Sequence, residues 1–384
     1  MFRVAALGLA TLAALAVAEV GLILTRGEQF FPYEPNQVFK KGPFDTRFTP
    51  GVSGDAYFTS NSFGCRGPEP DGEQYRLLCV GGSTTNCMAL DDSEAWPQVL
   101  MERVNEAKGD PRFLWVTASG KEGRNSRHHI AHAEHLVPRI PDLDHVLIYC
   151  GINDVVSWIL QDKFTQDDLA DPTQWREIVA ESFWISSYTP SDLPWYRHLQ
   201  LWRLLSTIKD DMETAMNASR EEGGDRIDVD FQQWMQIRKN KRQERSFRRL
   251  DAARLERFEV EVAAYRDRLV RLADSARAAG AEPIFMPQAM HYRDLSEEEL
   301  RHLWVGRFPD KTMIDPDQLQ DLVDQVNDVM REVAAEMNVA LVDLPALLQG
   351  EEKIFHDGVH FSEHGSRTAA QLIATALLEK VYQQ

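Results

Sequence analysis

Five short apolar runs, separated by longer amphipathic stretches, place the strongest constraint on how this 384-residue chain can fold. Short apolar runs bounded by turn residues or charges are typical of buried β-strands, and they lie here at 75–80, 113–117, 145–150, 283–286 and 339–344. Helices are expected between and after them, at 93–107, 126–138, 251–279, 316–337 and 364–382. The alternation predicts an α/β fold with a doubly wound, near-parallel sheet.

One long segment, residues 155–250, interrupts this alternation. We interpret the segment as a helical insertion, with a lid over the site as one role for it. It holds six tryptophans, and for each of them a place in the ordinary hydrophobic core of the insertion is the favoured interpretation. A basic stretch at 238–249 stands out against an acidic background. Such a run is usually a solvated helix face, and contact with anionic lipid or glycan is the alternative.

The first part of the chain carries an apolar segment, Val4 to Leu24, which is long enough to cross a bilayer as a helix. It predicts a protein that leaves the cytoplasm and faces the periplasm or cell exterior. Either the segment is a retained anchor, which we favour, or it is a signal peptide cut after Ala18. We therefore divide the chain into an anchor or signal at 1–26, a linker-like extension at 27–74 and one domain at 75–384.

Charge and cysteine content exclude two classes of function. The net charge is −18, with 60 acidic and 42 basic residues, whereas a nucleic-acid-binding surface needs concentrated Lys and Arg. Four cysteines without paired spacing predict neither a disulfide scaffold nor a zinc site. We expect small buried cysteines, no metal and no cofactor.

Four short polar signals follow the predicted strands. In parallel sheets, the loops beyond the carboxyl ends of the strands converge and bind ligands. Three signals lie just past the first three strands and the fourth lies on a loop before the last helix: Gly81-Gly82-Ser83-Thr84, Gly120 to Ser126, Gly151-Ile152-Asn153-Asp154 and Asp357-Gly358-Val359-His360. We expect all four at one edge of the sheet.

Two of these signals supply the parts of an activated serine. A serine hydroxyl needs a nearby imidazole to take its proton, and His360 is the best base for Ser83. Asp357, three residues earlier, can reach the imidazole and fix its tautomer. His356, His364 and His291 are rivals, but none has a carboxylate placed so simply.

The other two signals supply oxyanion donors. The side-chain amide of Asn153 and the backbone N–H groups of Gly123 and Ser83 can together stabilise a developing negative charge. For Asp154 and Gly120 we prefer structural roles. Taken alone, Gly-Gly-Ser-Thr could be a turn, a helix cap or part of a phosphate loop, although no Walker Gly-Lys-Ser/Thr follows.

In this order, the blocks of Ser83, Gly123, Asn153 and His360 resemble the SGNH hydrolases, also called the GDSL esterase/lipase superfamily. The resemblance covers about residues 75–155 and 280–380. It implies a flavodoxin-like three-layer α/β/α fold and metal-free ester hydrolysis by a Ser83–His360–Asp357 triad. It also implies an oxyanion hole formed by Ser83, Gly123 and Asn153.

Two features depart from the family pattern. Gly-Gly-Ser-Thr stands where the family name has Gly-Asp-Ser-Leu, and the long insertion is absent from small members. The variant first block is similar to that of a membrane-anchored bacterial branch, in which a segment like Asn61-Ser62-Phe63-Gly64-Cys65-Arg66-Gly67 precedes the first strand.

These observations predict an extracytoplasmic serine esterase that cleaves an acyl ester, acetyl among the candidates, carried by a small molecule, lipid or glycan. One alternative is an O-acyltransferase acting on a cell-envelope glycan, with Met290 to Arg293 near the acceptor. The other is a non-catalytic binding or assembly protein on the same fold. The sequence does not favour any oligomeric state.

Overall fold

The computed structural model of the chain describes residues 11, 13–22, 29–161, 169–186, 196, 199–202, 204, 205, 209 and 246–383. Within these residues, five strands form a single parallel sheet in the spatial order β11-β9-β6-β4-β5. Their bounds are Tyr75–Gly81 (β4), Leu114–Ala118 (β5), His145–Cys150 (β6), Glu282–Pro287 (β9) and Ala340–Leu341 (β11). All five predicted strands are present, and the last is shorter than the apolar run 339–344.

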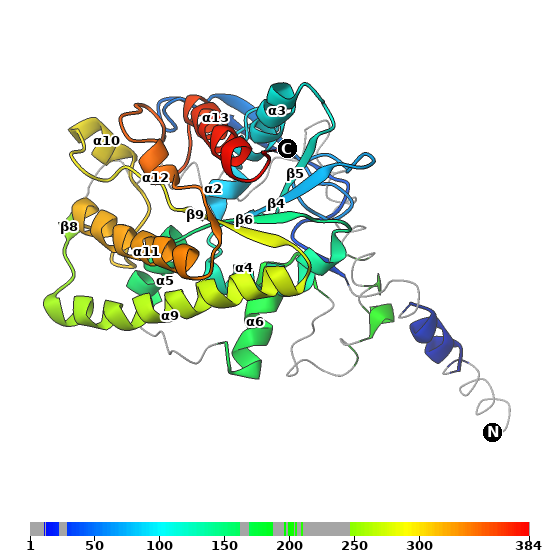
Figure 1. The fold of residues 1–384 in the computed structure, drawn as a ribbon. Helices are drawn as coiled ribbons and strands as arrows, with labels where there is room; N and C mark the ends of the chain where they lie inside the picture. Colours follow the sequence, from blue (N-terminus) through cyan, green and yellow to red (C-terminus); the bar gives the residue numbers. More distant parts are fainter. Residues whose placement is uncertain are drawn as a thin grey trace.

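Helices cover both faces of this sheet and make the three layers that were expected (Figure 1). On one face lie α3 (Trp96–Lys108) and α13 (Glu363–Lys380), which pack against each other. The other face is covered by α4 (Ser126–Ala131), α9 (Ala252–Ala278) and α11 (Pro316–Glu336). Two apolar clusters, one on each side of the sheet, form the core.

Local sequence accounts for where these helices begin. Asp251, Asp315 and Ser362 each accept a hydrogen bond from a backbone N–H in the first turn of α9, α11 and α13, which satisfies donors that have no partner inside the helix. The predicted helix at 126–138 is less regular: after α4 the chain continues as a π turn, His132–Leu136, and a 3₁₀ turn, Val137–Arg139. Pro138 lacks the N–H that a continuing α-helix would use.

The extension before the sheet has more regular structure than the linker we expected. Strands β2 (Val38–Phe44) and β3 (Gly54–Thr59) form an antiparallel hairpin, and β1 (Phe30–Phe31) pairs with β7 (Ile185–Ser186). The Pro, Gly and Phe content of this stretch hid the hairpin. After the hairpin, Arg66 exchanges two backbone hydrogen bonds with Ala118 and so extends the sheet beyond β5.

Only part of the predicted insertion is described. It begins with α5 (Ile152–Gln161) and continues in α6 (Pro172–Ser182). Trp158 is buried against Phe258, so this ring belongs to the core. Residues 238–245 of the basic stretch lie outside the described residues, as does Trp234, whereas β8 (Phe247–Arg248) pairs in parallel with β10 (Met313–Ile314).

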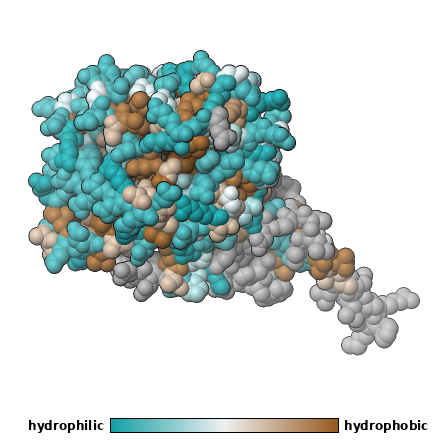
Figure 2. Space-filling view, viewed as in Figure 1, coloured by the Kyte–Doolittle hydropathy of each residue, from teal (hydrophilic) through white to brown (hydrophobic). Residues whose placement is uncertain are grey.

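The apolar segment near the start of the chain is helical over residues 13–22, and residues 1–10 and 23–28 lie outside the described part. Among the helices that the structure describes, none combines the length and apolarity needed to cross a bilayer. Glu19 accepts hydrogen bonds from the backbone N–H groups of Gln200 and Leu201. On the face seen in Figure 2, hydrophilic residues predominate and apolar residues form separate patches.

Candidate active site

Ser83 begins a single helical turn, α2 (Ser83–Asn86), directly after β4. Glycine at position 82 is required by space, because a Cβ there would collide with the Asn153 side-chain nitrogen. The turn is too short for a helix dipole of any size, so the contribution that we expected from a helix N-terminus is small. What this turn provides is a half-buried hydroxyl at the edge of the sheet.

Arg66 holds the far end of this turn. Its guanidinium donates to the backbone oxygens of Asn86 and Cys87, 2.6 and 3.0 Å away, and to that of Leu90 at 2.8 Å. It also pairs with Asp92 at 2.7 Å, and its side chain is 1% exposed. Carbonyl groups at the end of a helix have no partner in the helix, and Arg66 supplies one from the preceding segment.

His360 and Asp357 reach Ser83 from a loop before α13. The distance from Ser83 Oγ to His360 Nε2 is 2.7 Å, and His360 Nδ1 lies 2.8 Å from Asp357 Oδ2. Because Asp357 accepts at Nδ1, the proton belongs on Nδ1 and leaves Nε2 as the acceptor for the Ser83 hydroxyl. The structure therefore brings together the three residues predicted from sequence.

The loop itself holds the Asp357 carboxylate in place. Its Oδ1 accepts the backbone N–H groups of Val359 and His360 at 3.1 and 2.8 Å. Gly358 has φ +87°, and a Cβ at this position would meet the ring of Tyr292. Only glycine fits such a turn without strain.

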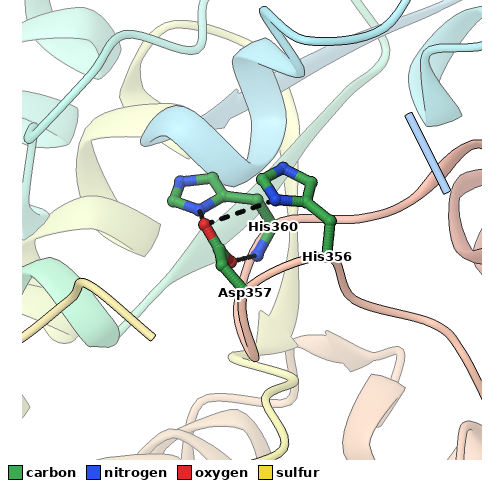
Figure 3. A group of neighbouring side chains, drawn as sticks. All are labelled: His356, Asp357 and His360. Carbon is green, nitrogen blue, oxygen red and sulfur yellow. Dashed lines mark hydrogen bonds and ion pairs between the residues drawn. The ribbon is translucent and has the colours of Figure 1, made fainter. Parts of the chain in front are cut away.

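Two aromatic residues that were not predicted as partners flank the pair. Trp304 donates its indole N–H to Asp357 Oδ2, and its ring stacks on His360 with centroids 5.5 Å apart and an interplanar angle of 13°. His356 lies on the Asp357 side, with Nδ1 3.6 Å from Oδ2 (Figure 3). Of the rivals to His360, His356 is buried beside the carboxylate, while His291 and His364 are exposed.

The three residues expected to supply oxyanion donors, Ser83, Gly123 and Asn153, line one cavity. Asn153 uses one N–H of its amide to donate to the Arg124 oxygen at 2.8 Å, which leaves the second N–H for another acceptor. In the described part of the chain, the backbone N–H groups of Ser83 and Gly123 have no acceptor. Donors without a partner, fixed next to a nucleophile, are what a transient oxyanion requires.

Asp154 and Gly120 have other surroundings. Asp154 is 1% exposed and accepts from the Ser126 N–H at 3.2 Å, with Arg268 at 3.5 Å. Gly120 packs against the backbone at Asn86, where a Cβ would not fit. Neither residue lines the cavity at Ser83.

The cavity at Ser83 has a volume of about 800 Å³. Most of its lining is apolar and comes from α5, from the turn after α2, from residues 304–311 and from the loop before α13: Met88, Ala89, Leu90, Ile152, Val156, Leu160, Val305, Phe308 and Phe361. Glu122, Arg307 and Lys311 are its charged lining residues. This volume is in the range of pockets that enclose a small organic ligand.

His356, Asp357 and His360 are also the three side chains whose ligand atoms, within the described residues, could together hold a metal ion. These atoms lie within 4.8 Å of one another. The carboxylate is already an acceptor for His360 and Trp304, so an ion here would have to displace those donors. That the protein needs no metal or cofactor stays a prediction.

Comparison with known proteins gives one family match. The model of the GDSL-like lipase/acylhydrolase family matches residues 79–368, and no curated protein matches the chain.

Solved structures match at low similarity. A lipolytic protein of the G-D-S-L family from Veillonella parvula has 14% identity and a TM-score of 0.40, with 81% of this chain and 100% of that chain covered. A lipase/acylhydrolase from Enterococcus faecalis has 14% identity and a TM-score of 0.40, over 80% and 96%. An acetylxylan esterase from Geobacillus stearothermophilus has 14% identity and a TM-score of 0.38, over 81% and 95%. Structural similarity this low carries no argument about the ester that this chain acts on.

Proposed function

Since the chain belongs to the GDSL-like lipase/acylhydrolase family, as its four polar blocks predicted, we propose that it is a serine esterase that cleaves an acyl ester through an acyl-enzyme on Ser83. The observation that carries the proposal is the continuous chain of hydrogen bonds from Ser83 through His360 to Asp357.

Each step of the proposed reaction uses a group already in position. Ser83 Oγ attacks the ester carbonyl carbon while its proton moves to His360 Nε2, and Asp357 stabilises the imidazolium that forms. The carbonyl oxygen becomes an oxyanion and accepts from the N–H groups of Ser83, Gly123 and Asn153. His360 then gives this proton to the leaving alcohol, and the acyl-enzyme remains. In the second half of the reaction His360 takes a proton from water as the water oxygen attacks the acyl carbon, and it passes that proton to Ser83 Oγ when the bond to Ser83 breaks and the acid leaves.

The cavity lining supports an acyl group larger than acetyl. Each buried methylene contributes about 0.8 kcal/mol to binding, and the apolar walls around Ser83 extend well beyond the reach of a two-carbon group. Transfer of the acyl group to a sugar hydroxyl would use the same acyl-enzyme on Ser83. An assay that contains an oligosaccharide would detect this transfer as an acylated sugar.

The apolar segment at residues 4–24 supports the further proposal that the enzyme acts outside the cytoplasm, anchored or after cleavage. Cell fractionation, with mass determination of the first peptide of the mature chain, separates the anchored form from the cleaved one. Recovery of the intact chain in the cytoplasm would contradict both.

A fluorophosphonate probe tests the proposed nucleophile. We expect the protein to be labelled, Ser83→Ala and His360→Ala to lose labelling, and Asp357→Ala to be labelled more slowly. Ser93→Ala is the matched control, because Ser93 is an exposed serine that donates to Asp91 and lies outside the cavity at Ser83. Labelling that persists in Ser83→Ala, or no labelling of the folded protein, would overturn the proposal.

A further inference from the structure

We propose that the substrate carries an anionic group, carboxylate or phosphate, in addition to its apolar acyl chain, and that Arg307 and Lys311 bind it. The inference rests on the proposed function and narrows it to one substrate class, the anionic amphiphilic esters. Both cations line the cavity that opens at Ser83.

The two cations lie on a folded segment that lines the cavity. Residues 306–314 close on themselves through backbone hydrogen bonds from Phe308 to Thr312 and from Ile314 to Gly306, at 2.8 and 3.0 Å. Phe308 between the two cations is buried, Arg307 is half-buried and Lys311 is exposed. The segment therefore buries its aromatic ring and leaves the two positive charges accessible to solvent.

Arg307 and Lys311 have no carboxylate partner among the described residues. The chain has 60 acidic and 42 basic residues, and two arginines that lie nearby in the sequence are paired. Arg301 approaches Glu297, and Arg293 contacts two aspartates. Both cations of the cavity lining are therefore available to a negatively charged ligand.

The acid nearest in sequence is directed elsewhere. Asp310 lies between the two cations in the chain, but its carboxylate pairs with Arg248 at 3.2 Å and accepts from Thr312 at 2.9 and 2.6 Å. The Arg248 guanidinium in turn lies 3.5 Å from the centre of the Phe308 ring. Asp310 therefore fixes the shape of the segment and leaves Arg307 and Lys311 for a ligand.

The cavity lining also holds an acidic residue, Glu122. Glu122 precedes Gly123 and accepts from the Asn86 side chain on the nucleophile turn. A negative group on the substrate would be repelled by this carboxylate and attracted by the two cations. The charges therefore favour one orientation, with the anion at residues 307–311.

The chemistry of the pair fits an oxyanion group. A guanidinium presents parallel N–H donors that match two oxygens of a carboxylate or phosphate, and an ammonium adds a mobile point charge. Two positive charges in one cavity would both attract an anionic ligand. A neutral ester would gain nothing from either residue.

Binding to the Ser83→Ala variant tests the inference apart from catalysis. Calorimetry with octyl phosphate, octanoate and neutral octyl glucoside, all below their micelle concentrations, should show tighter binding of at least one anion. Arg307→Gln and Lys311→Gln should each weaken anion binding by roughly fivefold, the value of one partly exposed ion pair of about 1 kcal/mol, and leave octyl glucoside unchanged. If octyl phosphate loses affinity in the Gln variants, the site prefers phosphate; if octanoate does, it prefers carboxylate.

Arg112→Gln is the matched control. Arg112 is an exposed arginine just before β5, at the amino ends of the strands, whereas Ser83 lies beyond the carboxyl ends. Its substitution by Gln changes the net charge by the same amount. It should leave the binding of all three probes unchanged.

Kinetics with the otherwise native enzyme complete the test. The kcat/KM for 1-octanoylglycerol 3-phosphate or O-octanoyl lactate should fall in the Gln variants, while that for neutral 1-octanoylglycerol should not. Equal losses for neutral and anionic ligands, or no preference for either anion, would overturn the inference. Failure of the proposed function is a different result: no ester would be cleaved faster by the native protein than by Ser83→Ala.

Discussion

The indole N–H of Trp304 gives a sharp test of how the site is held. Trp304→Phe keeps an aromatic ring over His360 and removes the donor to Asp357 Oδ2. A hydrogen bond to a charged group contributes about 1.5–3 kcal/mol. Because Asp357 retains the donors from His360 Nδ1 and two backbone N–H groups, we take the lower value, which corresponds to a loss in kcat of about tenfold.

The effect should appear in kcat and not in KM, since Trp304 acts through the carboxylate and the phenyl ring still lines the cavity. Steady-state hydrolysis of an octanoyl ester and the rate of fluorophosphonate labelling both measure it. Trp158→Phe is the matched control: Trp158 is a buried tryptophan packed on Phe258 that does not line the cavity, and its substitution should leave kcat unchanged.

A double-mutant cycle decides whether the donor works through Asp357. In an Asp357→Asn background the charged acceptor is gone, so Trp304→Phe should then change kcat by less than about twofold. A tenfold loss in both backgrounds would refute the reasoning and assign Trp304 a packing role only. A rise in KM at constant kcat would do the same.

Four further outcomes are expected. Lengthening the acyl group from acetyl to hexanoyl should raise kcat/KM about fourfold per methylene, or roughly 200-fold in all, because burial of each methylene contributes about 0.8 kcal/mol. A kcat/KM that does not change with acyl length would show that the acyl group does not enter the cavity. Asn153→Ala should lower kcat by about two to three orders of magnitude with the fold intact, and unchanged turnover would remove Asn153 from the oxyanion hole. Arg66→Gln should lower the free energy of unfolding in urea by about 2–3 kcal/mol, because it removes the partner of the half-buried Asp92 carboxylate and leaves buried backbone oxygens of Asn86, Cys87 and Leu90 without their donor; a loss below about 1 kcal/mol would contradict this. Burial lowers the pKa of His132 to about 3. Below the unfolded value of about 6.5 the unfolded chain therefore binds a proton that the folded chain does not, and the free energy of unfolding should fall by about 1.4 kcal/mol per pH unit down to about pH 3. Urea unfolding at pH 7.5 and pH 5.5 should show a smaller loss of stability in His132→Asn than in the native protein.

The sheet could be predicted because its signal is local. Strands such as His145–Cys150 are runs of apolar residues buried on both faces, and such runs stand out in any sequence. The hairpin Val38–Phe44 with Gly54–Thr59 was missed because its first strand is mostly half-buried without alternation, and its second buries only Ala56 and Phe58. Its pairing depends on a partner strand and not on local composition.

The candidate site divides in the same way. Ser83, Asn153, Asp357 and His360 follow strands or sit in a recognisable spacing, so their chemistry could be predicted. Trp304 could not, because its partner Asp357 lies 53 residues further along the chain and nothing around Leu303 and Val305 marks it. In the sequence, Arg66 stood out only as part of the segment Asn61 to Gly67 that resembles a family branch. Its contacts could not be predicted, because most of its acceptors are backbone oxygens, which every residue type carries.

The contact between Ser83 and His360 joins residues 277 positions apart, and this separation has a consequence in time. A ribosome adds about 5–20 residues per second, so the hydroxyl is made roughly 14 to 55 seconds before the base that must take its proton. Throughout that interval the growing chain carries an ordinary, unreactive serine. The proposed capacity to attack esters arises only after the ribosome has passed His360.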